Sequence, residues 1–392
     1  MNVELCTIGG KTVVKAGGRI DSACASEFAD RLAEAAQAVG EGELTIDLGS
    51  VSYISSSGLR ALLKLRKTRG EEIRLVEVVP QVYDVLEMTG FTSMFRVRKQ
   101  LRELSLEGCQ ELGHGVTGRV FRVDDETVLK LFGPDYSVDD VEKERTLARA
   151  ALLSGLPTAI SYETVRSGNC YGTLFELVKA SNVSQLVSDA PEKARQMGER
   201  MGLLLKEIHA TEPATKDIPA AKTLYDTHLS LATEYLTADE VETLKWAVGQ
   251  VPDVRRMVHG DFHPKNVMDQ QGEWLLIDMS DVCYGHPVFD WAQTYLVCVL
   301  MDETEAGSAQ DVIGLTGEPL RQLWEGLVEA YYGEPLSAGR AQVMRAYCLL
   351  HIITMPTYHW GSRQIFLPIM DRLRRHIPFI KETAARFDEL WQ

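Results

Sequence analysis

The sequence predicts two domains, an α/β sandwich followed by a two-lobed α+β domain whose second lobe is mostly helical. Strand-like and helix-like segments alternate over the first hundred residues, which is typical of a mixed sheet covered by helices. A glycine-rich segment at 113–118 is followed by two alternating strands instead of a helix, and the pattern beyond Trp291 is mostly helical. The expected boundaries are residues 1–100 for the first domain, 101–178 for the first lobe of the second domain and 179–392 for its second lobe.

In the first domain the expected order is β-β-α-β-α-β-α-β. Gly9-Gly10 has the turn chemistry of a hairpin between two β-branched runs. Asp21-Ser22 can cap a helix whose apolar residues recur at helical spacing as far as Ala36. The apolar run Leu44–Leu48 predicts a buried strand. The other expected strands cover 3–8, 12–16, 73–79 and 94–97, and the other expected helices cover 58–68 and 81–88.

The segment Ile46–Leu63, which contains Ser-Ser-Ser-Gly-Leu, resembles the STAS domain of anti-sigma factor antagonists. Thr89-Gly90-Phe91 strengthens the resemblance, which covers about the first hundred residues. The resemblance implies that this domain binds an anti-sigma factor or a related regulatory kinase, and that Ser56 is a phosphorylation switch. Family members usually have an aspartate just before that serine, and this sequence has Ser55 instead.

Phosphorylation at Ser56 is also physically reasonable. A phosphate adds about −1.5 to −2 charge, and the unpaired N–H groups and dipole at a helix amino terminus can hold it. The alternative is that the three serines only cap the helix that begins near Gly58. Both interpretations stay open.

The second domain begins with a complete Gly-x-Gly-x-x-Gly motif at Gly113, Gly115 and Gly118. Glycines are needed where a backbone lies close over phosphates. Dinucleotide-binding folds share the motif, but there it opens a helix. Here the strands Arg119–Val123 and Thr127–Phe132 follow, so the context favours the glycine-rich hairpin of a kinase.

Lys130, on the second of these strands, can reach the α- and β-phosphates of ATP and needs a carboxylate partner. The next helix offers Glu142 and Glu144, and we choose Glu144 because it shares a helical face with small apolar residues. Later strands lead to Glu176-Leu-Val178, where an inter-lobe hinge would bind adenine through its backbone. Glu176 and Val178 are therefore candidate nucleotide-binding residues.

The run His-Gly-Asp-Phe-His-Pro-Lys-Asn at 259–266 carries the strongest chemical signal. Phosphoryl transfer needs one carboxylate to orient the acceptor hydroxyl and oxygen ligands to hold Mg²⁺. Asp261 is the candidate catalytic base, while Asn266 and Asp278 are the candidate metal ligands. Each residue alone has a structural explanation, but their ordered combination with the glycine motif and Lys130 favours a kinase fold.

Residues 107–392 resemble the aminoglycoside phosphotransferase and choline kinase superfamily, with His263-Pro264 inside the loop as the main sign. The resemblance implies the same roles for Asp261, Asn266 and Asp278, with Lys130 as the phosphate clamp. It also makes Asp290 a structural cap of the helix that follows.

The composition and charge of the sequence bear on whether the protein binds membranes, nucleic acids or cationic substrates. The 45% hydrophobic and 25% charged residues are typical of a soluble protein, and no signal peptide or long uncharged apolar stretch is present. We therefore expect a cytoplasmic protein that does not bind membranes. The net charge of −15 falls on residues 101–392, because the first 100 residues are balanced. This charge argues against nucleic-acid binding and would suit a cationic substrate, although a solvated acidic surface explains it equally well.

Two functional classes follow. In the first, the protein is an ATP- and Mg²⁺-dependent phosphotransferase that acts on a small hydroxylated molecule and carries a STAS regulatory module. In the second, it is a partner-switching protein whose kinase-like domain senses nucleotide or phosphorylates a protein serine, Ser56 included. Tyr358, His359 and Trp360 could form an aromatic wall for a cationic substrate, or they could simply be packed core.

Overall fold

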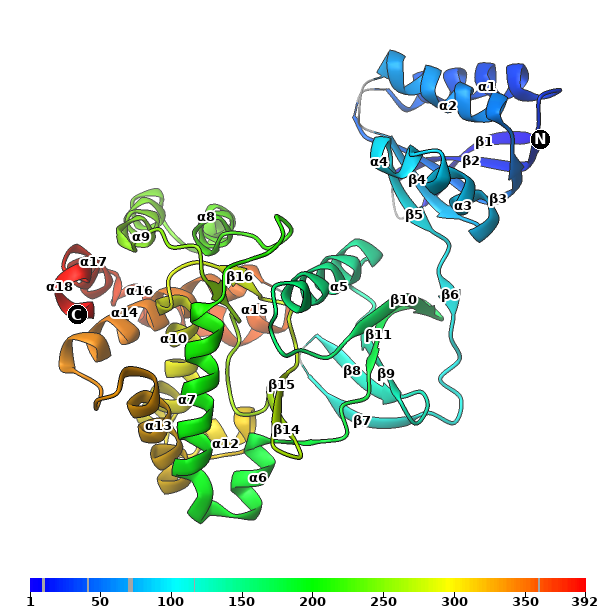
Figure 1. Ribbon diagram of the computed structural model, residues 1–392. Coiled ribbons are helices and arrows are strands. Elements are labelled where there is room, and N and C mark those ends of the chain that lie inside the picture. The colour runs from blue at the N-terminus through cyan, green and yellow to red at the C-terminus, as the bar shows by residue number, and fades with distance from the viewer. Residues whose placement is uncertain (9–10, 41, 70–72, 116, 359) are drawn as a thin grey trace. The chain divides into compact units, whose positions relative to one another are not determined.

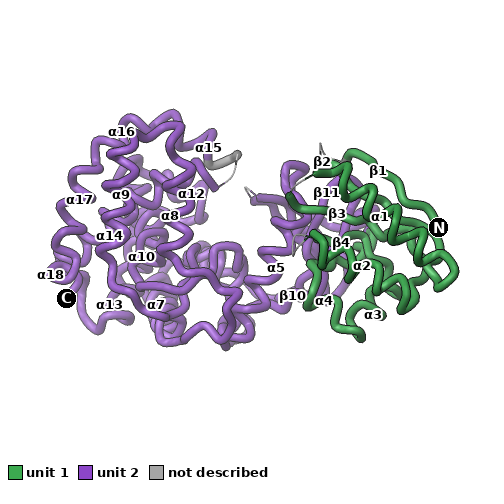
Figure 2. Tube along the Cα trace, turned by 90° about the horizontal axis from the view of Figure 1, so that it is seen from above, with its two compact units in different colours: residues 1–103 green, residues 104–392 purple. Residues whose placement is uncertain are grey.

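The computed structural model describes residues 1–392 except 9–10, 41, 70–72, 116 and 359, and it divides into two compact units, residues 1–103 and 104–392 (Figure 2). Buried apolar side chains form one core within the first unit and two further cores within the second. In the described part of the chain, no helix combines the length and apolarity that a membrane crossing requires. Each unit therefore has its own hydrophobic interior.

The first unit contains a five-stranded mixed sheet with the order β1-β2-β3-β4-β5. β1 is antiparallel to β2, whereas the other neighbours are parallel and need helical crossovers. The α/β fold predicted from the sequence is confirmed, with α4 as an additional helix. The elements are β1 (Asn2–Ile8), β2 (Lys11–Ile20), α1 (Ala25–Val39), β3 (Leu44–Ile54), α2 (Ser56–Arg69), β4 (Ile73–Val78), α3 (Pro80–Met88), α4 (Phe91–Met94), β5 (Arg96–Lys99) and β6 (Arg102–Glu103).

The helices of this unit pack against the sheet, and α1 and α2 lie side by side (Figure 1). The predicted cap at Asp21-Ser22 is wrong, because α1 begins only at Ala25, after Cys24. Asp21 Oδ1 instead accepts a hydrogen bond from Ala23 N–H at 3.1 Å in the preceding turn. A capping side chain must stand directly before its helix, and Asp21 lies too far upstream.

The first lobe of the second unit is a sheet in which β10, β11, β9, β8 and β7 are successive antiparallel neighbours. α5 packs against β10 and β11 (Figure 1). It begins with a capping box, in which Ser137 Oγ accepts from Asp140 N–H at 3.3 Å and the Asp140 carboxylate accepts from Ser137 N–H at 2.8 Å. The elements are β7 (Gln110–His114), β8 (Gly118–Arg122), β9 (Thr127–Phe132), α5 (Val138–Leu153), β10 (Ser161–Ser167) and β11 (Cys170–Glu176).

The second lobe is mostly helical, as predicted, and contains two small antiparallel sheets, β12-β14-β15 and β13-β16. Its strands are β12 (Ser181–Asn182), β13 (Met257–Val258), β14 (Val267–Gln270), β15 (Glu273–Leu276) and β16 (Cys283–Tyr284). Its helices are α6 (Val183–Asp189), α7 (Ala194–Ala210), α8 (Ala221–Leu231), α9 (Ala238–Gln250), α10 (Val288–Tyr295), the π-helical η3 (Leu296–Leu300), α11 (Met301–Thr304), α12 (Ser308–Ile313), α13 (Gly317–Tyr332), α14 (Ala338–Thr354), α15 (Trp360–Phe366), α16 (Met370–Arg374), α17 (Ile377–Ala385) and α18 (Phe387–Trp391), with 3₁₀ turns η1 (Pro191–Lys193), η2 (Ala232–Glu234), η4 (Met355–Thr357) and η5 (Leu367–Ile369).

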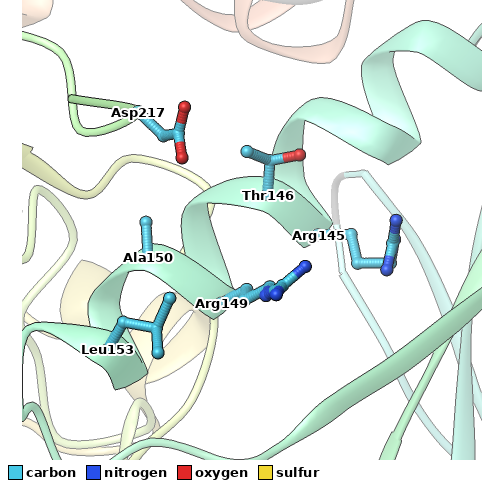
Figure 3. A pocket seen from close by; sticks show the side chains of 6 residues that line it. All are labelled: Arg145, Thr146, Arg149, Ala150, Leu153 and Asp217. Carbon is cyan, nitrogen blue, oxygen red and sulfur yellow. The ribbon is translucent and has the colours of Figure 1, made fainter. Parts of the chain in front are cut away.

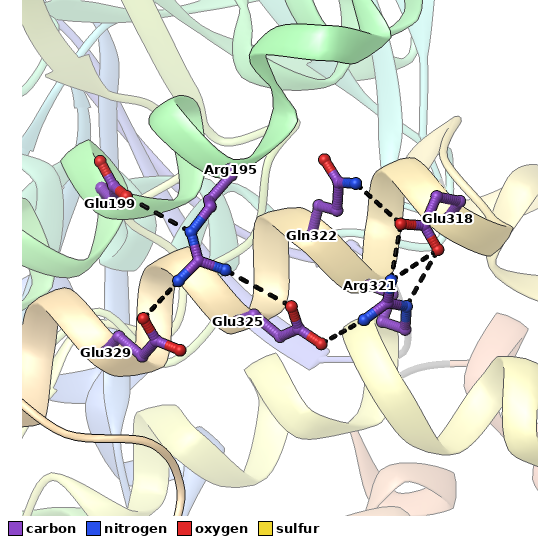
Figure 4. A network of polar contacts seen from close by, with 7 residues as sticks. All are labelled: Arg195, Glu199, Glu318, Arg321, Gln322, Glu325 and Glu329. Carbon is purple, nitrogen blue, oxygen red and sulfur yellow. Dashed lines mark hydrogen bonds and ion pairs between the residues drawn. The ribbon is translucent and has the colours of Figure 1, made fainter.

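Helices α7 and α13 lie side by side and approach closely through glycines (Figure 1). A Cβ atom on Gly198 would lie 2.0 Å from Leu323 O, and one on Gly326 would lie 2.3 Å from Arg195 O. Ion pairs border the same contact, among them Arg195 with Glu329 (Figure 4). Only glycine permits this separation of the two helices.

Candidate active site

The predicted glycine motif lies in the hairpin formed by β7 and β8. Gly115 N–H donates to Gly118 O at 2.8 Å across the turn. A Cβ atom on Gly118 would lie 2.1 Å from Leu131 O, so glycine is required there for β8 to approach β9. Cβ atoms on Gly113 and Gly115 would meet no described atom within 4 Å. The first two glycines thus border open space, and the third is needed for sheet packing.

Lys130 joins the two lobes electrostatically. Its Nζ lies 2.9 Å from Glu144 Oε1 on α5 and 2.9 Å from Asp278 Oδ1 in the second lobe. Burial alone would lower the pKa of Lys130, but the charges of Asp278 and Glu144 outweigh it and raise the pKa above its ordinary value. Glu142 pairs with Arg145 instead, at 2.8 Å. The structure therefore brings Glu144, the residue chosen from the sequence, to Lys130.

Asp261 is held by donors on both carboxylate oxygens. Gln293 Nε2 donates to Oδ1 at 2.7 Å, and Asn266 Nδ2 donates to Oδ2 at 3.0 Å. His263 Nε2 lies 3.4 Å from the same Oδ2. Burial would raise the pKa of Asp261, but the charge of His263 and the hydrogen bonds from His263 and Gln293 lower it below its ordinary value. Asp261 is thus an oriented, ionised carboxylate, and Gln293 is a partner that the sequence pattern did not reveal.

Asp290 does not cap α10 as expected. It lies within the first turn of that helix, and its carboxylate accepts from His259 N–H at 2.9 Å and Gly260 N–H at 2.7 Å. His209 Nε2 contacts the same carboxylate at 2.9 Å. A capping side chain stands directly before its helix, whereas Asp290 is the third residue of α10 and the helix has no side-chain cap. Asp290 therefore anchors the backbone that presents Asp261.

Asp278 stands in the left-handed region at φ 60°, a conformation that non-glycine residues adopt rarely and mostly at functional sites. Ser280 Oγ lies 3.0 Å from Asp278 Oδ1 and 3.1 Å from Asp281 Oδ2. Burial and the charges of Asp261 and Asp278 raise the pKa of Asp281 to about 7. Asp281 was not predicted, and with the two aspartates it concentrates negative charge at this point.

The predicted metal ligands, Asn266 and Asp278, lie on neighbouring segments of the second lobe. Among the described residues, no group of three or more His, Cys, Asp or Glu side chains is placed to hold a metal ion. Asn266 and Asp278 offer one amide and one carboxylate oxygen, and Ile277 N–H donates to Asn266 O at 3.0 Å, which keeps their segments adjacent. Oxygen donors and excess negative charge suit Mg²⁺, which usually takes one or two protein ligands plus substrate phosphates. The residues present therefore fit that ion.

Residues 108–326 match the sequence profile of the family described as "Phosphotransferase enzyme family", which covers more than half of the chain. The chain belongs to this phosphotransferase enzyme family. Residues 2–104 match the profile of the STAS domain, so the phosphotransferase carries a STAS domain in its first unit. Both family resemblances predicted from the sequence are confirmed.

A curated relative matches the STAS domain of this phosphotransferase, and solved structures are similar to a larger part of the chain. The STAS part is 37% identical over 101 residues to "Putative anti-sigma factor antagonist BtrV" from Bordetella bronchiseptica, a match that covers 25% of this chain and 85% of that protein. Among solved structures, a choline/ethanolamine kinase family protein from Mesorhizobium loti is similar with a TM-score of 0.43 and 14% identity, covering 72% of this chain and 88% of that one. The amicoumacin kinase hAmiN, in complex with AMP-PNP, Ca²⁺ and Ami, is similar with a TM-score of 0.46 and 14% identity, covering 75% of this chain and 92% of that one.

Several backbone groups of the predicted hinge, residues 176–178 of the phosphotransferase, already form hydrogen bonds within the protein. Leu177 N–H donates to Glu126 O at 2.7 Å, and Glu176 N–H donates to Ile160 O at 2.9 Å. Val178 O accepts from Ala180 N–H at 3.0 Å, whereas Val178 N–H has no backbone partner among the described residues. Within the described part of the chain, Val178 is therefore the hinge residue whose N–H has no backbone partner and could meet a ligand.

The expected aromatic wall is only partly described, since His359 lies outside the described residues and so does the side chain of Trp360. Tyr358 stacks on His228 with ring centroids 3.9 Å apart and an interplanar angle of 4°. Burial, followed by the charge of Asp281, raises the pKa of Tyr358 above its ordinary value. The structure thus pairs Tyr358 with His228, a residue that was not predicted.

A separate cavity of about 250 Å³ lies along α5 (Figure 3). None of the predicted site residues lines it. It is therefore not the site that the motif residues form. Its lining residues are Arg145, Thr146, Arg149, Ala150, Leu153 and Asp217.

In the STAS domain, Ser55, Ser56 and Ser57 differ in exposure and in their hydrogen bonds. Ser55 is 8% exposed, and its Oγ accepts from Gly58 N–H at 3.3 Å. Ser57 Oγ accepts from Arg60 Nη2 at 2.9 Å. Ser56 is exposed at the first residue of α2, whose first turn holds no acidic residue. Capping is therefore the role of Ser55, and Ser56 stands accessible beside it.

Proposed function

We propose that the second unit transfers the γ-phosphoryl group of ATP to a hydroxyl of a small molecule, with Mg²⁺ as the metal. The observation that carries this proposal is the meeting of Lys130, Glu144 and Asp278 through two 2.9 Å contacts, with Asp261 oriented beside them by Asn266. Phosphoryl transfer needs this set of charges and little covalent chemistry.

Each residue then has a defined role. Asp261 orients the acceptor hydroxyl and receives its proton, while Lys130, positioned by Glu144, binds the α- and β-phosphates. Asn266 and Asp278 would hold Mg²⁺, which neutralises the phosphate charge when it is bound. The backbone at Glu176 and Val178 would bind adenine, beneath the hairpin of Gly113, Gly115 and Gly118.

We also propose that the acceptor carries a positive charge. Asp261, Asp278 and Asp281 form an acidic group, in which burial and then the charges of Asp261 and Asp278 raise the pKa of Asp281 to about 7. Tyr358 also stacks on His228, and the faces of aromatic rings attract organic cations.

The test is a screen of the purified full-length protein with ATP and Mg²⁺ against aminoglycosides, amino alcohols, sugars and nucleosides, following ADP release. Wild type is expected to release ADP faster with one class of acceptor, and most strongly with cationic members. The Asp261→Asn variant, which keeps the shape of the side chain, is expected to lose that increase. Absence of any acceptor-dependent release, or an equal rate in Asp261→Asn, would contradict the proposal.

A second role is favoured by the exposed Ser56 and by the similarity to an anti-sigma factor antagonist. We propose that the STAS domain binds an anti-sigma factor or regulatory kinase, and that phosphorylation of Ser56 changes this binding. Mass spectrometry after incubation with ATP and Mg²⁺ shows whether Ser56 gains phosphate, with Ser56→Ala as the control. Equal incorporation in Asp261→Asn would exclude the second unit as the kinase for this serine.

A further inference from the structure

Gln293 is a polar side chain in a buried helix. Every residue of α10 is buried, and Gln293 is 9% exposed. Its Nε2 donates to Asp261 Oδ1 at 2.7 Å. Its Oε1 is buried without a hydrogen-bond partner among the described residues. One end of the amide is therefore strongly bound and the other end is not.

This asymmetry indicates why a glutamine stands here. A buried amide oxygen without a partner is unfavourable, and an apolar side chain of similar size would avoid the penalty. Turning the amide by 180° would bring Oε1 against Asp261 Oδ1, and two acceptors repel each other. The hydrogen bond to Asp261 thus fixes the orientation of the Gln293 amide. An apolar side chain could not make this bond, because it has no N–H donor.

The two oxygens of Asp261 also differ in their remaining capacity. Oδ2 accepts from Asn266 Nδ2 at 3.0 Å and faces His263 Nε2 at 3.4 Å. Oδ1 meets Gln293 alone among the described residues. Each carboxylate oxygen has about two lone-pair sites, so Oδ1 keeps one open. The Asp261 side chain is 25% exposed, which lets a ligand reach it.

We infer that Gln293 is a positioning residue that fixes the rotation of the Asp261 carboxylate and leaves Oδ1 as the oxygen that receives the acceptor's proton. This inference rests on the proposed phosphotransferase function. In the step, the acceptor oxygen bonds to the γ-phosphorus while the bond to the β–γ bridging oxygen breaks. The hydroxyl proton passes to Oδ1, and ADP leaves.

The substitution Gln293→Met tests the inference, because it keeps the length of the side chain and removes both the donor and the unpaired oxygen. With an acceptor from the screen, kcat is expected to fall about 10- to 100-fold, because a small misplacement of a reacting group lowers the rate of the chemical step by such factors. The KM values for ATP and acceptor should change less than about threefold, and the melting temperature by less than about 3 °C. Gln342→Met is the matched control, since Gln342 Nε2 donates to Thr383 Oγ1 at 3.1 Å in another part of the lobe. It should keep wild-type kcat.

A kcat equal to that of wild type in Gln293→Met, or a loss of kcat that is matched by a loss of melting temperature, would overturn the inference. Crystal structures of wild type and Gln293→Met decide it without any turnover. The Asp261 carboxylate should rotate or adopt several orientations in the variant, and an unchanged orientation would refute the positioning role. If wild type turns over no acceptor, the proposed function fails, while these structures still show whether Gln293 orients Asp261.

Discussion

At the residue scale, the position of Lys130 depends on which acidic residue of α5 it meets. Glu144 is 6% exposed and pairs with Lys130, whereas Glu142 pairs with Arg145 on the same helix. We expect Glu144→Gln to lower kcat/KM for ATP about 10- to 100-fold, because the lysine is then less well positioned over the phosphates. Glu142→Gln is the matched control and should stay within about twofold of wild type. Steady-state ADP release measures both, and equal losses in the two variants would contradict the assignment.

The residues that could be predicted from the sequence are those whose role follows from local spacing. Asp261 and Asn266 belong to one short motif, and Lys130 follows its glycine hairpin directly. Gln293 contacts Asp261 from 32 positions along the chain, and no local pattern marks it. The role of Asp290 was predicted wrongly for the same reason, since its partners lie 30 and 31 positions away.

At the element scale, Ser55 caps helix α2, whereas the neighbouring Ser56 is exposed at its first residue. Ser55 Oγ accepts from Gly58 N–H at 3.3 Å, so Ser55→Ala should lower the free energy of unfolding by about 1 kcal/mol. Ser56→Ala should change it by less than about 0.5 kcal/mol, because Ser56 is exposed. Urea unfolding followed by circular dichroism measures both variants. A larger effect at Ser56 than at Ser55 would be inconsistent with the cap.

The contact between α7 and α13 gives a second prediction at this scale. A Cβ atom on Gly202 would lie 2.3 Å from Leu327 O, so Gly202→Ala should destabilise the protein by about 1–3 kcal/mol through overpacking. Gly249→Ala on α9 is the matched control, since its Cβ would meet no described atom within 4 Å. Alanine there should stabilise the helix by up to about 1 kcal/mol. Thermal unfolding measures both variants. Melting temperatures that both rise or both fall relative to wild type would contradict the packing argument.

Elements were more predictable than their ends. Alternation and helical spacing are local, and they placed β3 and α2 within the first unit. The start of α1 and the existence of α4 were missed, because the short segments around Cys24 and Phe91 carry no strong periodic signal and are fixed by packing. The sheet order also needs contacts between distant segments, which spacing alone does not give.

At the scale of the whole molecule, the stability of the second unit depends on pH through buried histidines such as His286. Burial lowers the pKa of His286 to about 4, from about 6.5 in an unfolded chain. The unfolded state then binds the proton more strongly, so this group removes stability as the pH falls below about 6.5. His286→Phe keeps the edge-on ring packing against Phe387 and Trp391.

We expect the free energy of unfolding of His286→Phe to change less between pH 7 and pH 5 than that of wild type, by about 2 kcal/mol. Urea unfolding at the two pH values measures the difference. His376→Gln, at an exposed position, should keep the wild-type dependence. An equal slope in wild type and His286→Phe would show that His286 is not the group responsible.

We expect one cluster of charges in the second unit to bind the triphosphate of ATP together with a metal ion. Isothermal titration calorimetry of the full-length protein with ATP, in Mg²⁺ and in EDTA, tests this most directly. We expect a Kd below about 1 mM in Mg²⁺, weaker binding in EDTA, and at least a tenfold loss of affinity in Asp278→Asn. Absence of metal-dependent binding in wild type, or unchanged affinity in Asp278→Asn, would contradict it.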